Sequence, residues 1–317
     1  MPFGRVFWAG VPIVLVVGGI TYLTAGKRHK DAIVRVVEVP RVATPVVVKV
    51  KPPPPPPMKG SFVALTGVGD DELLSQGFTL THPMEVRVYA MGEGDPGEMY
   101  DYGWIVNADT RETVWRMEYQ RSEHAGGAQK NRLVDEVIKL DAGNYMVYYK
   151  SDGSHSWNEW NSSAPVHQEA WGITLLSPSG VVDRKAVGEY EVPSDPSVLA
   201  QLIGIRDDEN RGYKFTLTEE TKVGIYALGE GADGEMYDFA WIQDAETGRA
   251  VWEMTYGMTE HAGGGEKNRL FRGSIVLQAG DYQLRYRSDG SHSLEDWNVN
   301  PPDNPLDYGV TLTRETG

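Results

Sequence analysis

The sequence predicts an all-β protein: two tandem antiparallel β-sandwich domains, of jelly-roll or immunoglobulin-like type, after a single N-terminal transmembrane helix. Three observations carry this prediction. Residues 78–81 (FTLT) recur at 215–218, and the same offset of 137 residues aligns much of the chain without a gap. Within each copy, apolar and polar residues alternate over short runs, and residues 6–25 carry no charge. A repeat of about 115 residues has the size of one domain.

The first element is the apolar segment at residues 6–25 (VFWAGVPIVLVVGGITYLTA). About 20 apolar residues are enough for a helix to cross a hydrocarbon core. A cleavable signal peptide is the alternative, but the sequence Leu23-Thr24-Ala25 fits a small-x-small cleavage site poorly. We therefore predict a retained anchor over residues 1–26.

A linker over residues 27–60 follows the anchor. Its residues 52–57 are six consecutive prolines, which favour a stiff polyproline II segment. Before them Val and Lys alternate, so Val46, Val48 and Val50 are candidate contacts to the sheet edge of a partner. A solvated spacer is the alternative interpretation.

The side of the membrane on which the body lies is ambiguous. Lys27, Arg28, Lys30 and Arg35 follow the apolar segment, and this favours a cytoplasmic body. An anchor followed by a Val- and Pro-rich spacer resembles the energy-transducing TonB-type proteins, and that resemblance implies a periplasmic body. We expect a bacterial inner-membrane protein with a periplasmic body, and keep the cytoplasmic arrangement as the alternative.

Each repeat, over residues 61–176 and 198–317, contains about eight short runs with a period of two, bounded by Gly, Asp and Asn. Such runs predict antiparallel strands. The connector, residues 177–197, contains one extra candidate strand at 186–193, and short helical turns are expected at 70–74 and 195–202. In the first repeat the strands are expected near residues 62–68, 77–81, 85–91, 104–106, 113–117, 133–140, 144–149 and 171–176.

The strand motifs Phe-Thr-Leu-Thr, Val-x-Val/Ile-Tyr-Ala and Leu-x-Ala-Gly-x-Tyr resemble those of bacterial pre-peptidase C-terminal β-sandwich domains. The resemblance covers about a third of each repeat. It implies an extracytoplasmic accessory domain that has no catalytic residues of its own. The repeated Gly-Glu-Met-Tyr-Asp, Glu-His-Ala-Gly-Gly and Ser-Asp-Gly-Ser-His-Ser blocks depart from that pattern.

The composition excludes several classes of function. The formal net charge is −15, and the repeats carry no basic cluster of the kind that nucleic acid binding needs. The chain has no cysteine, which excludes disulfides, thiolate metal ligands and a Cys nucleophile. No phosphate-binding loop, dinucleotide fingerprint or nucleophile elbow is present. We therefore expect a protein that is not an enzyme, with no catalytic residues and no organic cofactor.

Polar residues that both repeats keep are the candidates for a binding site. The interpretation we favour is loop ordering, including a pair between Arg132 and Glu98 or Asp101. A metal site and a small-molecule site are the alternatives, since carboxylates, histidines and Gly-rich loops are typical of Ca²⁺ or Zn²⁺ sites, although no spacing here is diagnostic. The candidate metal ligands are Glu98, Asp101, His124, Asp152, His155, Glu235, Asp238, His261, Asp289 and His292.

Anchor, stiff spacer and paired domains together predict a non-enzymatic scaffold that holds subunits of an integral membrane protein complex. Trp160-Asn161 and Trp297-Asn298 lie in polar, loop-like surroundings and are candidate partner contacts. The chain as a whole resembles accessory extrinsic subunits of bacterial reaction-centre and light-harvesting complexes, which implies a photosynthetic partner. The alternative function is an envelope binding module for a glycan or a divalent metal ion.

Overall fold

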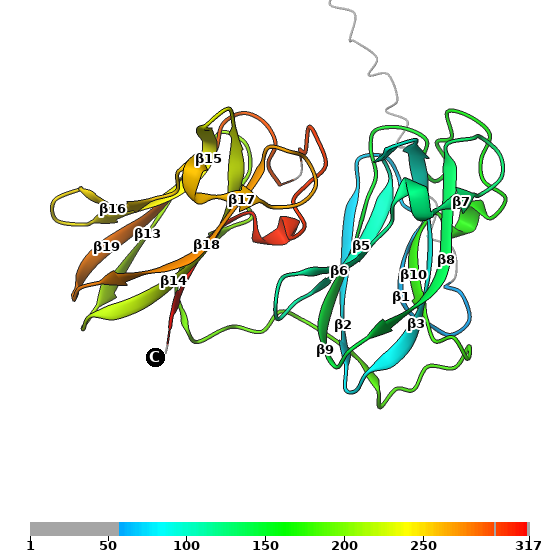
Figure 1. The fold of residues 1–317 in the computed structure, drawn as a ribbon, viewed down its shortest axis with the longest axis horizontal. Coiled ribbons are helices and arrows are strands. Elements are labelled where there is room, and N and C mark those ends of the chain that lie inside the picture. Colours follow the sequence, from blue (N-terminus) through cyan, green and yellow to red (C-terminus); the bar gives the residue numbers. More distant parts are fainter. Residues whose placement is uncertain (1–56, 295, 316–317) are drawn as a thin grey trace, which may run out of the picture. The chain divides into compact units, whose positions relative to one another are not determined.

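The computed structural model describes residues 57–294 and 296–315 (Figure 1). The predicted anchor, most of the linker and the candidate contacts Val46, Val48 and Val50 lie outside the described residues. Within the described part of the chain, no helix has both the length and the apolar character that crossing a membrane requires. The helical elements there are short 3₁₀ turns, and the described chain is otherwise built from antiparallel strands. The expected all-β, antiparallel class is confirmed.

The first repeat forms two sheets. In the first, the strand order is β1-β10-β3-β8-β7, with β4 paired to β3, and in the second it is β11-β2-β9-β5-β6. The strands are β1 (Ser61–Thr66), β2 (Leu73–Leu80), β3 (Met84–Asp95), β4 (Glu98–Met99), β5 (Tyr102–Asn107), β6 (Thr113–Arg116), β7 (Glu123–His124), β8 (Asn131–Leu140), β9 (Gly143–Lys150), β10 (Gly172–Leu176) and β11 (Val187–Glu189).

The second repeat reproduces this arrangement, and its two layers are β12-β20-β14-β18-β17 and β13-β19-β15-β16. They join where β14 pairs with β15. The strands are β12 (Val198–Ile203), β13 (Asn210–Leu217), β14 (Thr221–Ala232), β15 (Glu235–Asp244), β16 (Ala250–Glu253), β17 (Glu260–His261), β18 (Asn268–Leu277), β19 (Gly280–Arg287) and β20 (Gly309–Arg314).

Alternation along the strands builds a separate core in each repeat. In β3, Val86 and Val88 point inward and are fully buried, while Glu85 is exposed and Arg87 is half-buried. The buried aromatic residues reinforce this packing, because Phe78 stacks on Tyr145 with ring centroids 5.1 Å apart. Phe215 and Tyr282 repeat the contact at 5.6 Å. Both pairs lie within one layer, whereas Phe62 of β1 meets Phe78 of β2 across the two layers at 5.4 Å, and contacts of this second kind hold the layers together.

The connector contributes a strand to the first repeat. Within it, β11 pairs antiparallel with the outer edge of β2. Gly77 of β2 makes this approach possible, since a methyl group at that position would lie 2.2 Å from the carbonyl oxygen of Tyr190. In the second repeat Lys214 stands in place of this glycine, and among the described residues β13 ends its sheet with no strand on its outer side.

Neither segment expected to form helical turns is a helix, and each makes one turn and then enters a strand. Residues 70–71 form a turn in which Asp71 has a positive φ of 54°, and strand β2 begins at Leu73. Residues 198–203 form strand β12. Pairing with a neighbouring strand decides the conformation of both segments, and it overrides their local helix preference.

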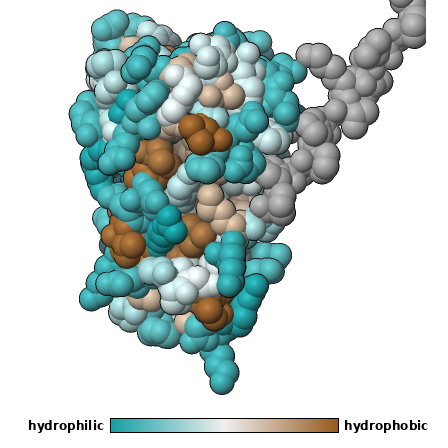
Figure 2. Space-filling model, turned by 90° about the vertical axis from the view of Figure 1, so that its right-hand side faces the viewer, coloured by the Kyte–Doolittle hydropathy of each residue, from teal (hydrophilic) through white to brown (hydrophobic). Residues whose placement is uncertain are grey.

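The face drawn in Figure 2 is largely hydrophilic, and its hydrophobic residues form separate spots among polar ones. The more exposed large hydrophobic residues of the described chain include Val166, Val181 and Val192, each about 70% exposed. These three lie in loops and the connector, outside the strands.

Candidate functional site

Three carboxylates meet at one end of each repeat, where the two layers join. In the first repeat they are Glu93 from the end of β3, Asp101 just before β5, and Asp152 two residues after β9. Each offers one oxygen, and these three oxygens lie within 4.8 Å of one another. Glu230, Asp238 and Asp289 form the equivalent group in the second repeat. We call these groups the acidic clusters.

Close backbone contact between β3 and the start of β5 brings the first two carboxylates together. Glu93 and Asp101 exchange backbone hydrogen bonds of 3.2 and 3.1 Å. Gly92 allows this contact because a methyl group there would lie 2.0 Å from the carbonyl oxygen of Asp101. Gly229 does the same in the second repeat, at 2.1 Å from the carbonyl oxygen of Asp238. A glycine beside the first carboxylate is therefore a geometric requirement of the cluster.

Backbone N–H groups orient the aspartates. The N–H of Asp152 donates to Oδ1 of Asp101 over 2.8 Å, and the N–H of Ser154 donates to Oδ1 of Asp152 over 2.9 Å. The second repeat has the same pair of bonds, 2.8 Å to Asp238 and 3.0 Å to Asp289. The loop after β9 or β19 is thus joined to the cluster through one aspartate, Asp152 or Asp289. The backbone N–H of this aspartate donates to the neighbouring aspartate, and its carboxylate belongs to the cluster.

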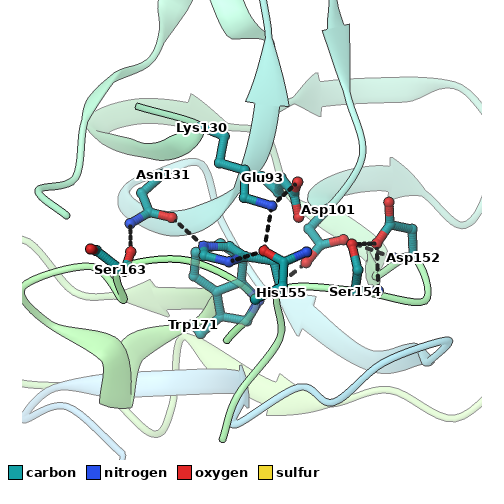
Figure 3. A network of polar contacts seen from close by, with 10 residues as sticks. Glu93, Asp101, Lys130, Asn131, Asp152, Ser154, His155, Ser163 and Trp171 are labelled. Carbon is teal, nitrogen blue, oxygen red and sulfur yellow. Dashed lines mark hydrogen bonds and ion pairs between the residues drawn. The ribbon is translucent and has the colours of Figure 1, made fainter. Parts of the chain in front are cut away.

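A lysine compensates part of the negative charge. Nζ of Lys130 donates to Oε1 of Glu93 over 2.7 Å and to Oδ1 of Asn161 over 2.8 Å (Figure 3). Nζ of Lys267 donates to Oε1 of Glu230 over 2.6 Å. With three carboxylates ionised, each cluster together with its lysine carries a charge of −2.

One oxygen of each glutamate is buried without a donor. Glu93 is 5% exposed and Glu230 is 3% exposed, and Oε2 of each has no hydrogen-bond partner among the described residues. An unsatisfied buried carboxylate oxygen is costly, at about 1–3 kcal/mol or more. The same atom lacks a donor in both repeats, and a bound ion, an ordered water or local strain are the general explanations for such an atom.

Burial also makes ionisation of the carboxylates unfavourable. It raises the pKa of Asp101 well above its usual value and the pKa of Asp238 to about 7. The pKa of Glu93 and that of Glu230 are raised for the same reason, although the ion pair with lysine opposes the shift. A bound cation would favour the ionised forms, since an opposite charge at close range lowers a carboxyl pKa.

The histidine of the Ser-Asp-Gly-Ser-His-Ser motif orders the loop from inside. His155 is fully buried and has a φ of 58°, and its Nδ1 and Nε2 contact Oδ1 of Asn161 at 2.9 Å and Oδ1 of Asn131 at 2.6 Å. The amide of Asn131 in turn donates to the carbonyl oxygens of Gly126 and Ser163. His292 and Asn268 repeat this arrangement. Both histidines therefore contact protein groups with both ring nitrogens.

The structure brings together some of the sequence-predicted ligands and separates others. Asp101, Asp152, Asp238 and Asp289 belong to the acidic clusters, but Glu98 and Glu235 are exposed and lie outside them. His124 and His261 are exposed and contact the backbone carbonyls of Ala128 and Gly265 at 3.0 Å. None of the four candidate histidines belongs to either cluster.

Sequence reasoning missed Glu93 and Glu230. Both stand in the motif Gly-Glu-Gly, which the two repeats share, at the end of an alternating strand. A charged residue that recurs between two glycines inside a strand was the available signal. The expected pair of Arg132 with Glu98 or Asp101 was also wrong, because Arg132 donates to Oγ and the carbonyl oxygen of Ser122 and lies over the ring of Tyr119.

The candidate partner contacts have packing roles in the structure. Trp160 is half-buried and meets His155 and Trp171 edge-on, with ring centroids 5.0 and 4.9 Å apart. Trp297 makes the same contacts with His292 and Tyr308. Asn161 and Asn298 place Oδ1 within hydrogen-bond distance of Nδ1 of these histidines. Their contact with a partner stays a prediction.

Comparisons with known proteins identify no family. No family model matches the chain, and no curated protein sequence matches it. Among solved structures, the CUB1-EGF-CUB2 domain of human MASP-1/3 is 12% identical with a TM-score of 0.23, covering 79% of this chain and 96% of that one. The CUB1-EGF-CUB2 domains of rat MASP-1 are 13% identical with a TM-score of 0.21, and the match covers 78% of this chain and 93% of that one. Vicilin from hazelnut (Corylus avellana) is 11% identical with a TM-score of 0.16, and the match covers 76% of this chain and 74% of that one. At these scores the similarities support no statement about fold or function.

Proposed function

We propose that each repeat is a divalent-cation-binding module, with Ca²⁺ as the preferred ion, and that the protein is a non-enzymatic binding protein whose loop ends are ordered by the ion. The observation that carries this proposal is the buried glutamate of each acidic cluster: its Oε2 has no hydrogen-bond partner among the described residues, and one of its oxygens lies within 4.8 Å of an oxygen from each of two aspartates. A cation at that point would satisfy the buried oxygens and offset the residual charge.

The chemistry of the donors favours Ca²⁺ over Zn²⁺. The cluster offers carboxylate oxygens only, whereas protein zinc sites are typically built from Cys and His. Ca²⁺ takes six to eight oxygen ligands in flexible geometry, so three carboxylates, backbone carbonyls and water suit it. Mg²⁺ demands stricter octahedral geometry and keeps several waters. We therefore expect the order Ca²⁺ above Mg²⁺, with Zn²⁺ not preferred.

An ion in this place would stabilise the joint between the two layers. Glu93 belongs to one layer, Asp101 directly precedes a strand of the other, and Asp152 lies in the loop over residues 151–167. Binding would lock this loop, which also carries Trp160 and Asn161, and so present a fixed surface to a partner. The predicted scaffold role is compatible with this function, because a partner would then recognise an ion-ordered surface.

A second candidate function is an ion-independent scaffold in which Lys130 serves as the permanent counter-charge. The 2.7 Å ion pair between Lys130 and Glu93 favours it. The buried Oε2 of Glu93 argues against it, because lysine leaves this atom without a donor. The two candidates differ in whether adding metal raises stability.

Isothermal titration calorimetry and thermal unfolding of the full chain in detergent test the proposal. Metal-stripped protein is titrated with Ca²⁺, Mg²⁺ and Zn²⁺. We expect two Ca²⁺ per chain and a higher unfolding temperature with Ca²⁺, since a ligand that binds the folded state stabilises it. Both effects should disappear when Glu93→Gln and Glu230→Gln are combined. Glu98→Gln combined with Glu235→Gln is the matched control at exposed positions. A Ca²⁺-indifferent wild type would overturn the proposal.

The membrane anchorage, the bacterial inner-membrane location with a periplasmic body, and a partner among integral membrane protein complexes, photosynthetic or otherwise, stay part of this proposal. Support comes from the apolar residues 6–25 and the following Pro-rich linker. Purification in mild detergent with and without Ca²⁺ tests the partner: a membrane complex should co-purify in Ca²⁺ and be lost on chelation. Protease digestion of intact spheroplasts tests the side, because only a periplasmic body is cleaved.

A further inference from the structure

The two acidic clusters use identical ligands but are supported differently. In the first repeat, Nε1 of Trp171 donates to Oδ2 of Asp101 over 3.3 Å, which is long for a hydrogen bond. In the second repeat the equivalent residue is Tyr308, and its hydroxyl donates to Oδ2 of Asp238 over 2.7 Å. Both donors are fully buried. Asp238 is therefore held firmly at both oxygens, and Asp101 firmly at only one.

The lysines differ in the same direction. Lys130 is tied to both Glu93 and Asn161, so any shift of Lys130 on cation binding would break two hydrogen bonds. Among the described residues, the hydrogen-bond partner of Lys267 is Glu230 alone. Displacing Lys267 consequently costs less than displacing Lys130.

We infer that the two repeats bind the cation with unequal affinity, the second about tenfold more tightly than the first, and that the donor at position 171 or 308 is the main residue setting the difference. This inference rests on the proposed function. Outer hydrogen bonds that orient a ligating group typically change metal affinity by about 10–100-fold. The carboxylates and the lysine are of the same type in both repeats, so we assign the difference to such supporting contacts.

The hydroxyl of Tyr308 orients its aspartate without removing a ligand. A carboxylate oxygen has two lone pairs, so Oδ2 of Asp238 keeps one for a metal after accepting from the hydroxyl. The bond also fixes the rotation of the carboxylate before the ion arrives. Trp171 supplies bulk at the same place but only a weak donor, so Asp101 must be ordered when the ion binds.

The experiment measures each site separately by calorimetry in the full chain. Glu93→Gln leaves the site of the second repeat, and Glu230→Gln leaves the site of the first. Tb³⁺ luminescence, excited through the neighbouring Trp171 or Trp297, gives an independent readout of occupancy. We expect the dissociation constant of the first site to be about ten times that of the second.

Substitutions at the supporting position then test the cause. Trp171→Tyr, made with Glu230→Gln, should tighten the first site several-fold, a gain that no purely structural role predicts. Tyr308→Phe, made with Glu93→Gln, should weaken the second site about tenfold by removing only the hydroxyl, and Tyr308→Trp should act similarly. Each replacement aromatic, apart from Phe, already occupies the same place in the other repeat, so folding is expected to persist.

The outcomes separate the inference from the proposed function. If neither site binds Ca²⁺ or Tb³⁺, the proposed function fails. If both bind with equal affinity, the proposed function stands and the inference is overturned. If the sites differ but Trp171→Tyr and Tyr308→Phe leave both affinities unchanged, the assignment to this position is wrong.

Discussion

Replacing Asp238 with asparagine is expected to change how the stability of the second repeat depends on pH. Burial raises the pKa of Asp238 from 3.8 to about 7 in the folded protein. The folded state therefore favours the protonated form. Its contribution to stability is complete below pH 3.8 and is lost as the pH rises through the folded-state pKa. Asp101 shifts in the same direction.

The size of the effect follows from the width of this window. One pKa unit corresponds to about 1.4 kcal/mol, so raising the pH from about 5 to about 7 should remove about 2 kcal/mol of stability through Asp238 alone. His292 acts in the opposite sense, because burial lowers its pKa from 6.5 to about 3 and its contribution is lost as the pH falls. The raw pH profile of the protein therefore mixes both effects.

The variant isolates the carboxyl contribution. Urea unfolding of metal-stripped wild type and Asp238→Asn is followed at pH 5 and pH 7 by tryptophan fluorescence, and the transition that the substitution moves belongs to the second repeat. Relative to wild type, the variant should be about 2 kcal/mol more stable at pH 7 than at pH 5. Saturating Ca²⁺ should stabilise wild type by about 3 kcal/mol at a hundredfold excess over the dissociation constant, and should leave the variant nearly unchanged at its second site. A difference between variant and wild type that is the same at both pH values would refute the reasoning.

Three further substitutions test the frame around the first cluster by urea unfolding. Gly92→Ala should cost at least about 2 kcal/mol and abolish Ca²⁺ binding to the first repeat, whereas Gly188→Ala, with open space around it, should be nearly neutral; equal costs would contradict the close-contact argument. Tyr149→Phe should cost about 1–2 kcal/mol, because the buried hydroxyl donates to the carbonyl oxygen of Met91 over 2.7 Å. Asn131→Ala should cost about 3 kcal/mol or more, since it removes two donors to loop carbonyls and leaves a buried imidazole nitrogen without its partner. For Tyr149→Phe or Asn131→Ala, a loss of stability below about 0.5 kcal/mol would show that water replaces the lost hydrogen bonds.

Much of the fold could be predicted from the sequence because each strand is amphipathic. The expected runs at 85–91 and 144–149 fall inside β3 and β9, and the repeat provides a second, independent reading of the same pattern. The acidic segment at residues 70–74 was expected to form a helical turn because its charges favour the start of a helix. In the structure Leu73 and Leu74 instead pair with β9.

The candidate site could be predicted only in part. Asp101, Asp152 and their counterparts stand in repeated polar motifs, so their importance was visible. That Glu93 joins them depends on the close crossing of β3 and β5 at Gly92, which is a three-dimensional fact. Conversely, a histidine that suggested zinc makes loop contacts instead. Both ring nitrogens of His155 contact asparagine side chains, those of Asn131 and Asn161.

The strand β11 determines where the first half of the chain should end when it is expressed alone. A first half expressed alone should extend through residue 193, since stopping at 176 would remove the strand that pairs with β2 and leave the outer edge of β2 unpaired. Among the described residues, no strand pairs with the equivalent outer edge of β13, where Lys214 stands in place of the glycine. The two halves therefore differ at this edge, and the first half has to be produced together with the segment that follows it.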